Sequence, residues 1–318
     1  MSPLLDVRNL MTYFFTTAGL VKAVRGLEFS IDRGETLALV GESGCGKSVT
    51  ALSLLRLVQP PGRVVEGELL FQGEDLRRLP PNEMRRVRGN RISMVFQEPM
   101  TALNPVLTIG EQIAEVLRLH RAASRQEALT GAADLLQQVG IGDPHLRLRE
   151  YPHQLSGGMR QRVVIAMALA CAPDLLIADE PTTALDVTIQ AQILDLLEQL
   201  KEQQKMATLL ITHDLGIVAE TADKVAIMNA GLIMEYAPTA TLFSRPTHPY
   251  TQGLLACIPR LGDKRHRLPI ITNRSQSGET PVGQSFLDGL NPPFAPVRNK
   301  LPSLVEIEPN HFVRCWRD

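Results

Sequence analysis

Short apolar runs separated by polar segments dominate the first ninety residues. Positions 4–10 alternate between apolar and polar side chains, residues 21–31 are rich in residues favoured in strands, and residues 36–40 form a short, mainly apolar run. Runs of this length and pattern predict β-strands. Helical periodicity begins immediately after Lys47, and residues 91–97 have the composition of another strand. The N-terminal part is therefore predicted to be mostly β, with one early helix.

The pattern changes over residues 98–158, where helix-capping signals replace the short apolar runs. Thr108 with Glu111, and Ser124 with Glu127, form capping-box pairs, in which a hydroxyl and a carboxylate satisfy backbone amides at a helix start. The second pair opens a segment whose apolar residues share one helical face. This stretch is therefore predicted to be a helical insertion.

Strand-like and helical segments alternate after the insertion. Apolar runs at 175–179, 208–213 and 224–229 flank a segment at 189–200 whose apolar residues lie on one helical face. Such alternation predicts an α/β fold with a mainly parallel sheet covered by helices. The last run continues through Asn-Ala-Gly into a second apolar run, which indicates a hairpin.

The C-terminal part differs in composition and periodicity from the preceding residues. Proline becomes frequent beyond residue 238, and residues 259–310 show little periodicity. We expect a loop-rich C-terminal extension here. The predicted domains are therefore residues 1–237 and 238–318.

Composition and charge narrow the class of protein. The 318 residues include 33 Lys and Arg against 34 Asp and Glu, and the formal charge of −1 gives no support for bulk nucleic-acid binding. The four cysteines are far apart and form no CxxC pair, so a secreted disulfide framework is not expected. The longest apolar run, residues 163–172, is shorter than the about 20 residues of a membrane helix, and no signal-peptide pattern opens the chain. We expect a chain that is neither secreted nor itself membrane-spanning.

A phosphate-binding motif, GxxxxGK[ST], occupies residues 41–48 between a predicted strand and a predicted helix. Its glycines let backbone amides point inward around phosphate oxygens, and the helix directs its positive end at the same anion. Lys47 is expected to reach the β- and γ-phosphates and Ser48 to bind Mg²⁺. A plain glycine-rich turn is the alternative, but it would not require the flanking strand and helix. Cys45, at the helix start, is interpreted as a small spacer rather than a redox switch. The nucleotide contacts predicted here are Gly41, Glu42, Ser43, Gly44, Cys45, Gly46, Lys47, Ser48 and Val49.

An acidic pair ends the apolar run at 175–179. Asp179 is expected at the C-terminal edge of the sheet, where a carboxylate holds Mg²⁺, often through water. Glu180 follows it and is suited to orient or deprotonate an attacking water. A buried strand that ends in a solvated acidic turn is the alternative, which the phosphate-binding motif weakens.

The most discriminating segment is LSGGMRQ at residues 155–161. Ser156 is a good helix N-cap, and Gly157 and Gly158 permit close approach of the backbone to a phosphate. Such a helix start can bind the γ-phosphate of a nucleotide held by a second protein molecule. An ordinary capped helix explains Ser156, but not the double glycine.

GESGCGKS, LSGGMRQ and LLIADE, in this order along the chain, make residues 4–237 similar to the ATP-binding subunits of ABC transporters. The resemblance implies a P-loop NTPase (RecA-like) core with an N-terminal antiparallel β subdomain and a helical insertion. Gln97 resembles the Q-loop glutamine, which meets Mg²⁺ and the attacking water. His213 resembles the switch histidine, which contacts the γ-phosphate.

Two further residues match this family. Asp186 resembles the D-loop aspartate, which touches the opposite subunit. Phe14 resembles the aromatic residue that stacks on adenine, although the neighbouring Tyr13 and Phe15 leave that assignment open.

Each match also has a simpler explanation. Gln97 could be a polar strand end and His213 an imidazole with its hydrogen bonds satisfied. Asp186 could be a helix N-cap, a role that it could combine with contact to the opposite subunit. The order of the motifs favours the family. The predicted catalytic residues are Glu180, His213 and Gln97, and the predicted Mg²⁺ ligands are Ser48, Gln97 and Asp179. The nucleotide contacts predicted outside the phosphate loop are Phe14, Ser156, Gly157, Gly158, Gln161 and Asp186.

Three further segments resemble the ATPase subunits of bacterial oligopeptide and dipeptide importers: QEPMTALNP at 97–105, DEPTTALDVTIQAQIL at 179–194 and HPYTQGLL at 248–255. The resemblance implies an ATP hydrolase that lies peripherally on the cytoplasmic face of the cell membrane. ATP held between two cassettes would close the pair, and hydrolysis would reopen it. Nickel and glutathione importers share this subgroup, so the transported substrate stays open.

The resemblance also implies partners. They are a second, related ATPase in a heterodimer, two transmembrane permease subunits and, indirectly, an extracytoplasmic substrate-binding protein, whereas no nucleic acid is expected. A permease segment is expected to dock near residues 97–105. Two other functions are weighed against this one: a soluble ABC-type ATPase acting on nucleic acid or ribosomes, and another P-loop enzyme such as a small-molecule kinase. Soluble ABC-type ATPases of that kind usually have a long coiled-coil insertion or two cassettes, and this sequence shows neither. A small-molecule kinase would leave the LSGGMRQ segment unexplained.

The C-terminal extension departs from the family pattern. Relatives often carry a Cys-rich segment that holds an iron–sulfur cluster, but Gln284 takes the first cysteine position in the corresponding stretch at 281–286. Only His311 and Cys315 keep the ending of that segment. Because such a cluster normally needs four thiolates, no iron–sulfur cluster is expected.

Overall fold

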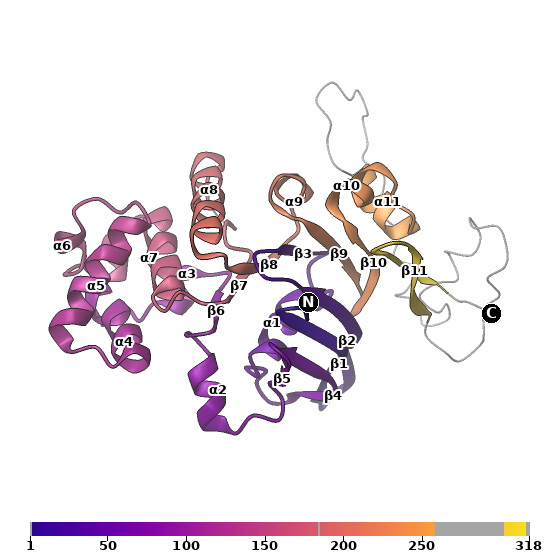
Figure 1. Ribbon diagram of the computed structural model, residues 1–318, viewed down its shortest axis with the longest axis horizontal. Coiled ribbons are helices and arrows are strands. Elements are labelled where there is room, and N and C mark those ends of the chain that lie inside the picture. The colour runs from indigo at the N-terminus through magenta and orange to yellow at the C-terminus, as the bar shows by residue number, and fades with distance from the viewer. Residues whose placement is uncertain (1, 184, 258–301, 316–318) are drawn as a thin grey trace.

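The computed structural model describes residues 2–183, 185–257 and 302–315. A helical region lies at one end of the molecule, the C-terminal elements lie at the other, and the N-terminal sheet lies beside the central sheet (Figure 1). This arrangement leaves the central sheet as the element that all other parts contact.

The N-terminal strands form an antiparallel sheet of order β2-β1-β4-β5. Leu10, Leu27 and Ile31 are fully buried in it, as the alternating apolar pattern predicted. The strands are β1 (Leu5–Thr16), β2 (Gly19–Ile31), β4 (Gly62–Phe71) and β5 (Glu74–Asp75).

The central sheet has eight strands among the described residues, in the order β11-β12-β10-β9-β3-β8-β7-β6. The five strands from β9 to β6 pair in parallel. β3, β7 and β8 are buried along their whole length, which explains their continuous apolar runs. The strands are β3 (Thr36–Val40), β6 (Ile92–Val95), β7 (Leu175–Asp179), β8 (Ala207–Thr212), β9 (Lys224–Asn229), β10 (Leu232–Pro238), β11 (Ser303–Glu308) and β12 (His311–Cys315).

The helices follow the predicted order. Both capping boxes are formed, at the starts of α4 and α5, and the insertion between β6 and β7 is helical as expected. β6 is shorter than the predicted strand, so Gln97 lies in the loop beyond it. The helices are α1 (Lys47–Leu54), α2 (Pro81–Val87), α3 (Pro99–Ala102), α4 (Ile109–Arg121), α5 (Arg125–Gln138), α6 (Pro144–Arg147), the short 3₁₀ helix η1 (Pro152–Gln154), α7 (Gly157–Leu169), α8 (Val187–Gln204), α9 (Leu215–Thr221), α10 (Thr239–Ser244) and α11 (Pro249–Ala256).

The expectation of a loop-rich C-terminal extension is wrong for residues 303–315. β11 and β12 form a hairpin, and β12 pairs with β10, so the hairpin extends the central sheet. The predicted hairpin of β9 and β10 is confirmed, and its outer strand supplies the edge that β12 covers. Residues 258–301, and with them the 281–286 stretch, lie outside the described residues.

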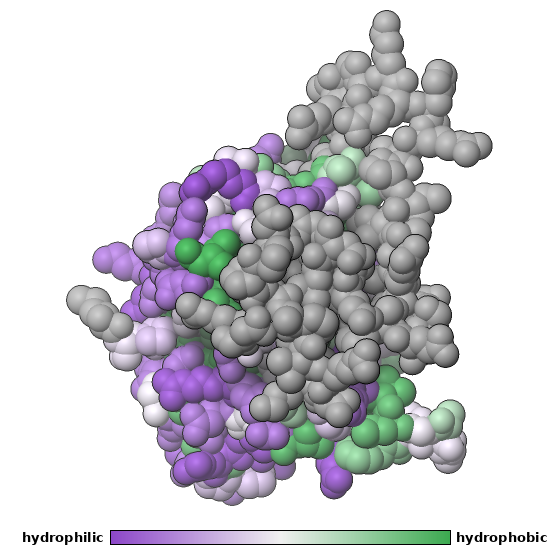
Figure 2. Space-filling view, turned by 90° about the vertical axis from the view of Figure 1, so that its right-hand side faces the viewer, coloured by the Kyte–Doolittle hydropathy of each residue, from purple (hydrophilic) through white to green (hydrophobic). Residues whose placement is uncertain are grey.

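The surface near the C-terminal end carries no continuous apolar band where described residues form it. Figure 2 shows a mainly hydrophilic surface there with separate hydrophobic patches. Among the described helices, none combines the length and apolarity needed to span a membrane.

Candidate active site

The phosphate-binding loop lies between β3 and α1, where the sequence predicted it. Gly46 has φ 111°, and a Cβ there would lie 2.4 Å from the carbonyl oxygen of Ala23. A Cβ on Gly41 would lie 2.1 Å from the carbonyl oxygen of Met228. Both glycines are therefore required by close backbone packing as well as by the curl of the loop.

Lys47 lies folded back over this loop. Its side chain is mostly buried, and Nζ donates to the carbonyl oxygens of Gly41 at 2.8 Å and Glu42 at 3.0 Å. These bonds satisfy a buried ammonium and hold the loop closed. The Lys47 ammonium thus already lies at the loop where the phosphates are expected to bind.

Ser48 and Asp179 bring two oxygen donors together at the end of β7. Ser48 Oγ donates to Asp179 Oδ1 at 3.2 Å, and Asp179 is buried. Burial raises the pKa of the Asp179 carboxyl, and the Ser48 hydroxyl opposes that shift. Because Mg²⁺ prefers such oxygen ligands, the pair fits this cation. Gln97, the third predicted ligand, bonds elsewhere.

The Glu180 carboxylate is the centre at which the predicted catalytic residues meet. Gln97 Nε2 donates to Glu180 Oε2 at 3.0 Å, and His213 Nδ1 lies 3.3 Å from Glu180 Oε1. Glu180 has φ 47°, a backbone conformation that a non-glycine residue adopts only where its surroundings hold it. Thr183 Oγ1 also donates to Glu180 Oε2, at 2.8 Å.

Thr183 is a candidate site residue that sequence reasoning missed. It lies within the family-like segment DEPTTALD, but that pattern gives no reason to select one threonine over the other. Only the fold, which turns its hydroxyl back onto Glu180, identifies it.

The LSGGMRQ segment begins α7 as predicted. Ser156 caps the helix, its Oγ accepting from the Met159 amide at 3.3 Å. A Cβ on Gly158 would lie 2.8 Å from Ile189 Cγ2, so this glycine also permits close packing of α7 against α8. Gln161 is only 1% exposed, which places its side chain inside the protein rather than beside Ser156.

Two other predicted contacts lie on different elements. Asp186 caps α8, its Oδ1 accepting from the Ile189 amide at 2.9 Å, so the N-cap interpretation is confirmed. The ring of Phe14 lies against Gly62, where an added Cβ would be 2.5 Å from Cε1. Neighbouring Phe15 is 44% exposed and has the Arg63 guanidinium over its ring.

Cys45 is buried in the phosphate-binding loop. Burial raises the pKa of its thiol, although Lys47 opposes this shift. A redox switch needs a thiol of lowered pKa, so the spacer interpretation is favoured.

Comparison with known proteins identifies the family. The sequence profile described as "ABC transporter" matches residues 24–183, half of the chain. The chain belongs to the ABC transporter family. A second profile, "Oligopeptide/dipeptide transporter, C-terminal region", matches residues 234–287 and places this ABC protein in the oligopeptide/dipeptide branch.

Its relatives agree over nearly the whole length. The probable peptide ABC transporter ATP-binding protein y4tR of Sinorhizobium fredii is 53% identical over 317 residues, covering 99% of this chain and 95% of that protein. The dipeptide transport ATP-binding protein DppD of Bacillus subtilis is 48% identical, with coverage of 99% and 95%. Among solved structures, the ATP-binding cassette MJ0796, described as dimeric, post-hydrolysis and bound to ADP and Pi, has a TM-score of 0.67 at 27% identity, covering 74% of this chain and 98% of that chain.

These matches confirm the predicted family, the predicted ABC cassette fold and the prediction of an ATP-binding transporter ATPase. They decide against the small-molecule kinase. They also favour the transporter over an ATPase acting on nucleic acid or ribosomes, since the C-terminal match is to peptide transporters.

Proposed function

We propose that this ABC protein binds and hydrolyses ATP to power an importer of dipeptides or oligopeptides, as a peripheral subunit on the cytoplasmic face of the membrane. The proposal of ATP hydrolysis rests on the contacts that Gln97, Thr183 and His213 make with the Glu180 carboxylate. The C-terminal profile match and the names of the relatives support the peptide cargo. We propose residues 1–237 as the ATPase domain, with residues 98–158 as its helical subdomain, and residues 238–318 as the importer-specific extension.

Hydrolysis starts with a water that the Glu180 carboxylate orients and deprotonates as it attacks the γ-phosphate. Thr183 and Gln97 hold this carboxylate from one oxygen, and His213 lies at the other, so its position is fixed before substrate arrives. Lys47 leaves the loop carbonyls to contact the β- and γ-phosphates. Ser48 and Asp179 would hold Mg²⁺, which neutralises developing phosphate charge when bound. Phe14 is proposed to stack on the adenine, with the neighbouring Tyr13 and Phe15 as the alternatives.

The second half of the site belongs to another cassette. Ser156, Gly157 and Gly158 open α7 with amides directed outward from its N-terminus, a natural anion site. In the proposed closed pair, they contact the γ-phosphate held by the opposite subunit, and Asp186 lies at the same interface. Val187, next to Asp186, is 82% exposed, as expected of an interface residue in an isolated subunit. The opposite subunit is proposed to be a related ATPase in a heterodimer.

The permease partners are proposed to dock in a groove between β6 and the helical insertion. This groove of about 260 Å³ is lined mainly by apolar residues of the Q-loop region, α4 and α7, and also by Gln112, Glu115 and His120 of α4. Phe96 is 37% and Leu119 74% exposed there. A coupling helix with an apolar face is the proposed occupant, because it suits the exposed apolar side chains of this groove. Phe96 of the groove adjoins Gln97, which links docking there to the Glu180 site. The substrate-binding protein acts outside, on the permease.

Glu180→Gln tests the hydrolytic assignment. The amide retains the side-chain shape but removes the base, so turnover should fall about 10²–10⁴-fold while ATP binding is retained and closed dimers accumulate. Glu202→Gln is the matched control, because Glu202 is an exposed carboxylate near the other end of α8. ATPase rates and size-exclusion profiles of the assembled transporter give both readouts. Unchanged hydrolysis by Glu180→Gln would remove Glu180 from its role.

A further inference from the structure

A two-residue turn joins β9 to β10 and lies inside the molecule. Asn229 pairs with Leu232, so Ala230 and Gly231 alone form the turn. Their φ angles are 47° and 81°, and a left-handed conformation at both positions is the geometry of a type I′ hairpin turn. Gly231 is buried, whereas chain connections usually run over the surface. The turn is therefore enclosed by other segments of the chain.

The backbone of Gly231 bonds to two of these segments. Its N–H donates to the carbonyl oxygen of Cys45 in the phosphate-binding loop at 2.9 Å. Its own carbonyl oxygen accepts from the amide of Arg25 on β2 at 2.8 Å. A Cβ on Gly231 would lie 2.8 Å from the carbonyl oxygen of Ala23, also on β2, so there is no room for a side chain. The turn therefore joins the phosphate-binding loop to the N-terminal sheet through backbone contacts alone.

The bond to Cys45 fixes the direction of one amide in the loop. The carbonyl of Cys45 and the N–H of Gly46 belong to the same peptide unit, which is planar and trans. In a trans unit the C=O and the N–H point in opposite directions. While Gly231 holds the Cys45 carbonyl, the Gly46 N–H must therefore point away from the turn. Amides of such loops bind phosphate only when they point inward together, so the direction of each one matters for affinity.

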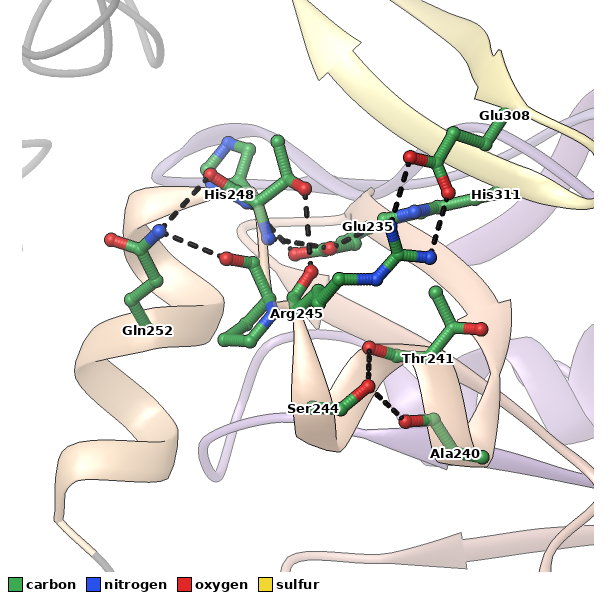
Figure 3. A network of polar contacts seen from close by, with 11 residues as sticks. Glu235, Ala240, Thr241, Ser244, Arg245, His248, Gln252, Glu308 and His311 are labelled. Carbon is green, nitrogen blue, oxygen red and sulfur yellow. Dashed lines mark hydrogen bonds and ion pairs between the residues drawn. The ribbon is translucent and has the colours of Figure 1, made fainter.

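The strand that follows the turn is held firmly by the C-terminal hairpin. Arg314 on β12 donates through Nε to the Ile233 carbonyl, beside an irregularity in the pairing of β10 with β9. Such bulges leave ladder groups unpaired, and the guanidinium satisfies this carbonyl. Further along β10, Glu235 is 0% exposed, accepts from the His248 amide at 2.9 Å and lies 2.8 Å from His311 Nε2 (Figure 3). β10 thus gives the turn a fixed base.

We propose that Gly231 is a positioning residue for ATP binding: its amide holds the Cys45 carbonyl outward and so turns the Gly46 N–H inward, towards a phosphate of ATP. Gly231 touches neither the nucleotide nor the reacting atoms and acts only through the loop. This inference rests on the proposed function, because it concerns the ATP that the loop binds.

Gly231→Ala tests this role. The added methyl group would lie 2.8 Å from the Ala23 carbonyl oxygen, so the turn must move and its bond to Cys45 is lost. The Kd of the full-length chain for a non-hydrolysable ATP analogue, measured by titration calorimetry, should rise about 2- to 12-fold, as expected for one hydrogen bond. In the assembled transporter, the KM for ATP should rise with kcat unchanged, because the loop holds the phosphates in the ground state and the transition state alike.

Gly73→Ala is the matched control. Gln72 and Gly73 form the two-residue turn between β4 and β5, and their φ angles are 52° and 84°. Alanine therefore meets the same backbone cost at Gly73 as at Gly231, but a Cβ on Gly73 has nothing within 4 Å. This control should lower the melting temperature and leave the Kd for the ATP analogue unchanged.

Gly231→Asn and Gly73→Asn form a second pair, which decides the question if Gly231→Ala does not fold. Asparagine tolerates the left-handed conformation better than alanine does, but at Gly231 it still carries the Cβ that meets Ala23. Gly231→Asn should therefore keep more stability than Gly231→Ala and still bind the ATP analogue more weakly than Gly73→Asn does.

The outcomes separate this inference from the proposed function. Wild-type affinity in the folded Gly231 variants would overturn the role of Gly231, and so would equal losses of affinity in the Gly231 and Gly73 variants. In both cases the wild-type chain would still bind the ATP analogue, and the proposed function would stand. A wild-type chain that binds no nucleotide would overturn the proposed function itself.

Discussion

Thr183 is a residue by which the assignment of Glu180 can be tested without touching Glu180. The substitution Thr183→Val keeps the size of the side chain but removes the hydroxyl that donates to Glu180 Oε2 at 2.8 Å. Glu180 retains Gln97 at 3.0 Å and the contact of His213 at 3.3 Å, so it loses orientation rather than all support. The carboxylate should therefore sample positions from which it cannot activate water.

The expected loss of kcat in Thr183→Val depends on how exposed the Thr183 hydrogen bond is. A hydrogen bond to a buried charge is worth about 1.5–3 kcal/mol, but an ordinary one contributes about 0.5–1.5 kcal/mol. Thr183 is exposed, so the lower range applies. If the loss appears in the transition state, kcat should fall about 2- to 12-fold with little change in the KM for ATP.

The assay is steady-state ATP hydrolysis by the assembled transporter. Thr130→Val is the matched control, because it removes an exposed threonine hydroxyl that bonds the Gln126 carbonyl on α5, far from Glu180 in sequence and on another element. It should leave both constants unchanged. An unaltered kcat in Thr183→Val would refute the view that Thr183 orients the base, and a raised KM alone would assign it to ground-state binding.

Two further predictions concern the composite site and His248, whose side chain caps α11. Ser156→Arg should leave ATP binding by this chain nearly intact, because Ser156 caps α7 and is not part of the phosphate loop. The same substitution should abolish turnover. Retained turnover would exclude Ser156 from any composite site. The pKa of His248 is lowered from 6.5 to about 4 in the folded protein. Between these pH values the unfolded chain binds a proton that the folded protein does not. The free energy of unfolding is therefore highest above pH 6.5 and falls as the pH is lowered towards 4. His248→Asn, which can still cap α11, should remove up to about 3 kcal/mol of that pH dependence in unfolding experiments, and an unchanged slope would contradict the assignment.

The parts of the site that sequence predicted correctly are those whose chemistry is local. Gly46 must be glycine because its φ is 111°, and Ser156 and Asp186 cap helices within three residues of themselves. Such constraints leave a pattern in consecutive residues. The resemblance assigned Gln97 to Mg²⁺ and the attacking water and His213 to the γ-phosphate. Their meeting at Glu180 was not predicted, because separation along the chain says nothing of distance in space.

The features that were missed depend on packing between distant segments. His311 meets Glu235 across 76 positions, and β11 and β12 gain their sheet partner only because β10 presents an edge. Gln161 was predicted as a nucleotide contact in the LSGGMRQ segment, but its side chain is buried, with 1% exposure. No local periodicity encodes these relations.

The packing of α7 against α8 has a consequence for the closed pair. Gly158 lies so close to Ile189 that a single methyl group would collide with it, and the amide of Ile189 is held by Asp186. The helix start proposed to contact the opposite nucleotide and the aspartate proposed for the interface are therefore joined through one close contact, that of Gly158 with Ile189. Because packed side chains transmit displacement rather than absorb it, a shift of α7 should displace Asp186 as well. Contact of Ser156 with a γ-phosphate would then position the interface around Asp186, so the two motifs act as one surface.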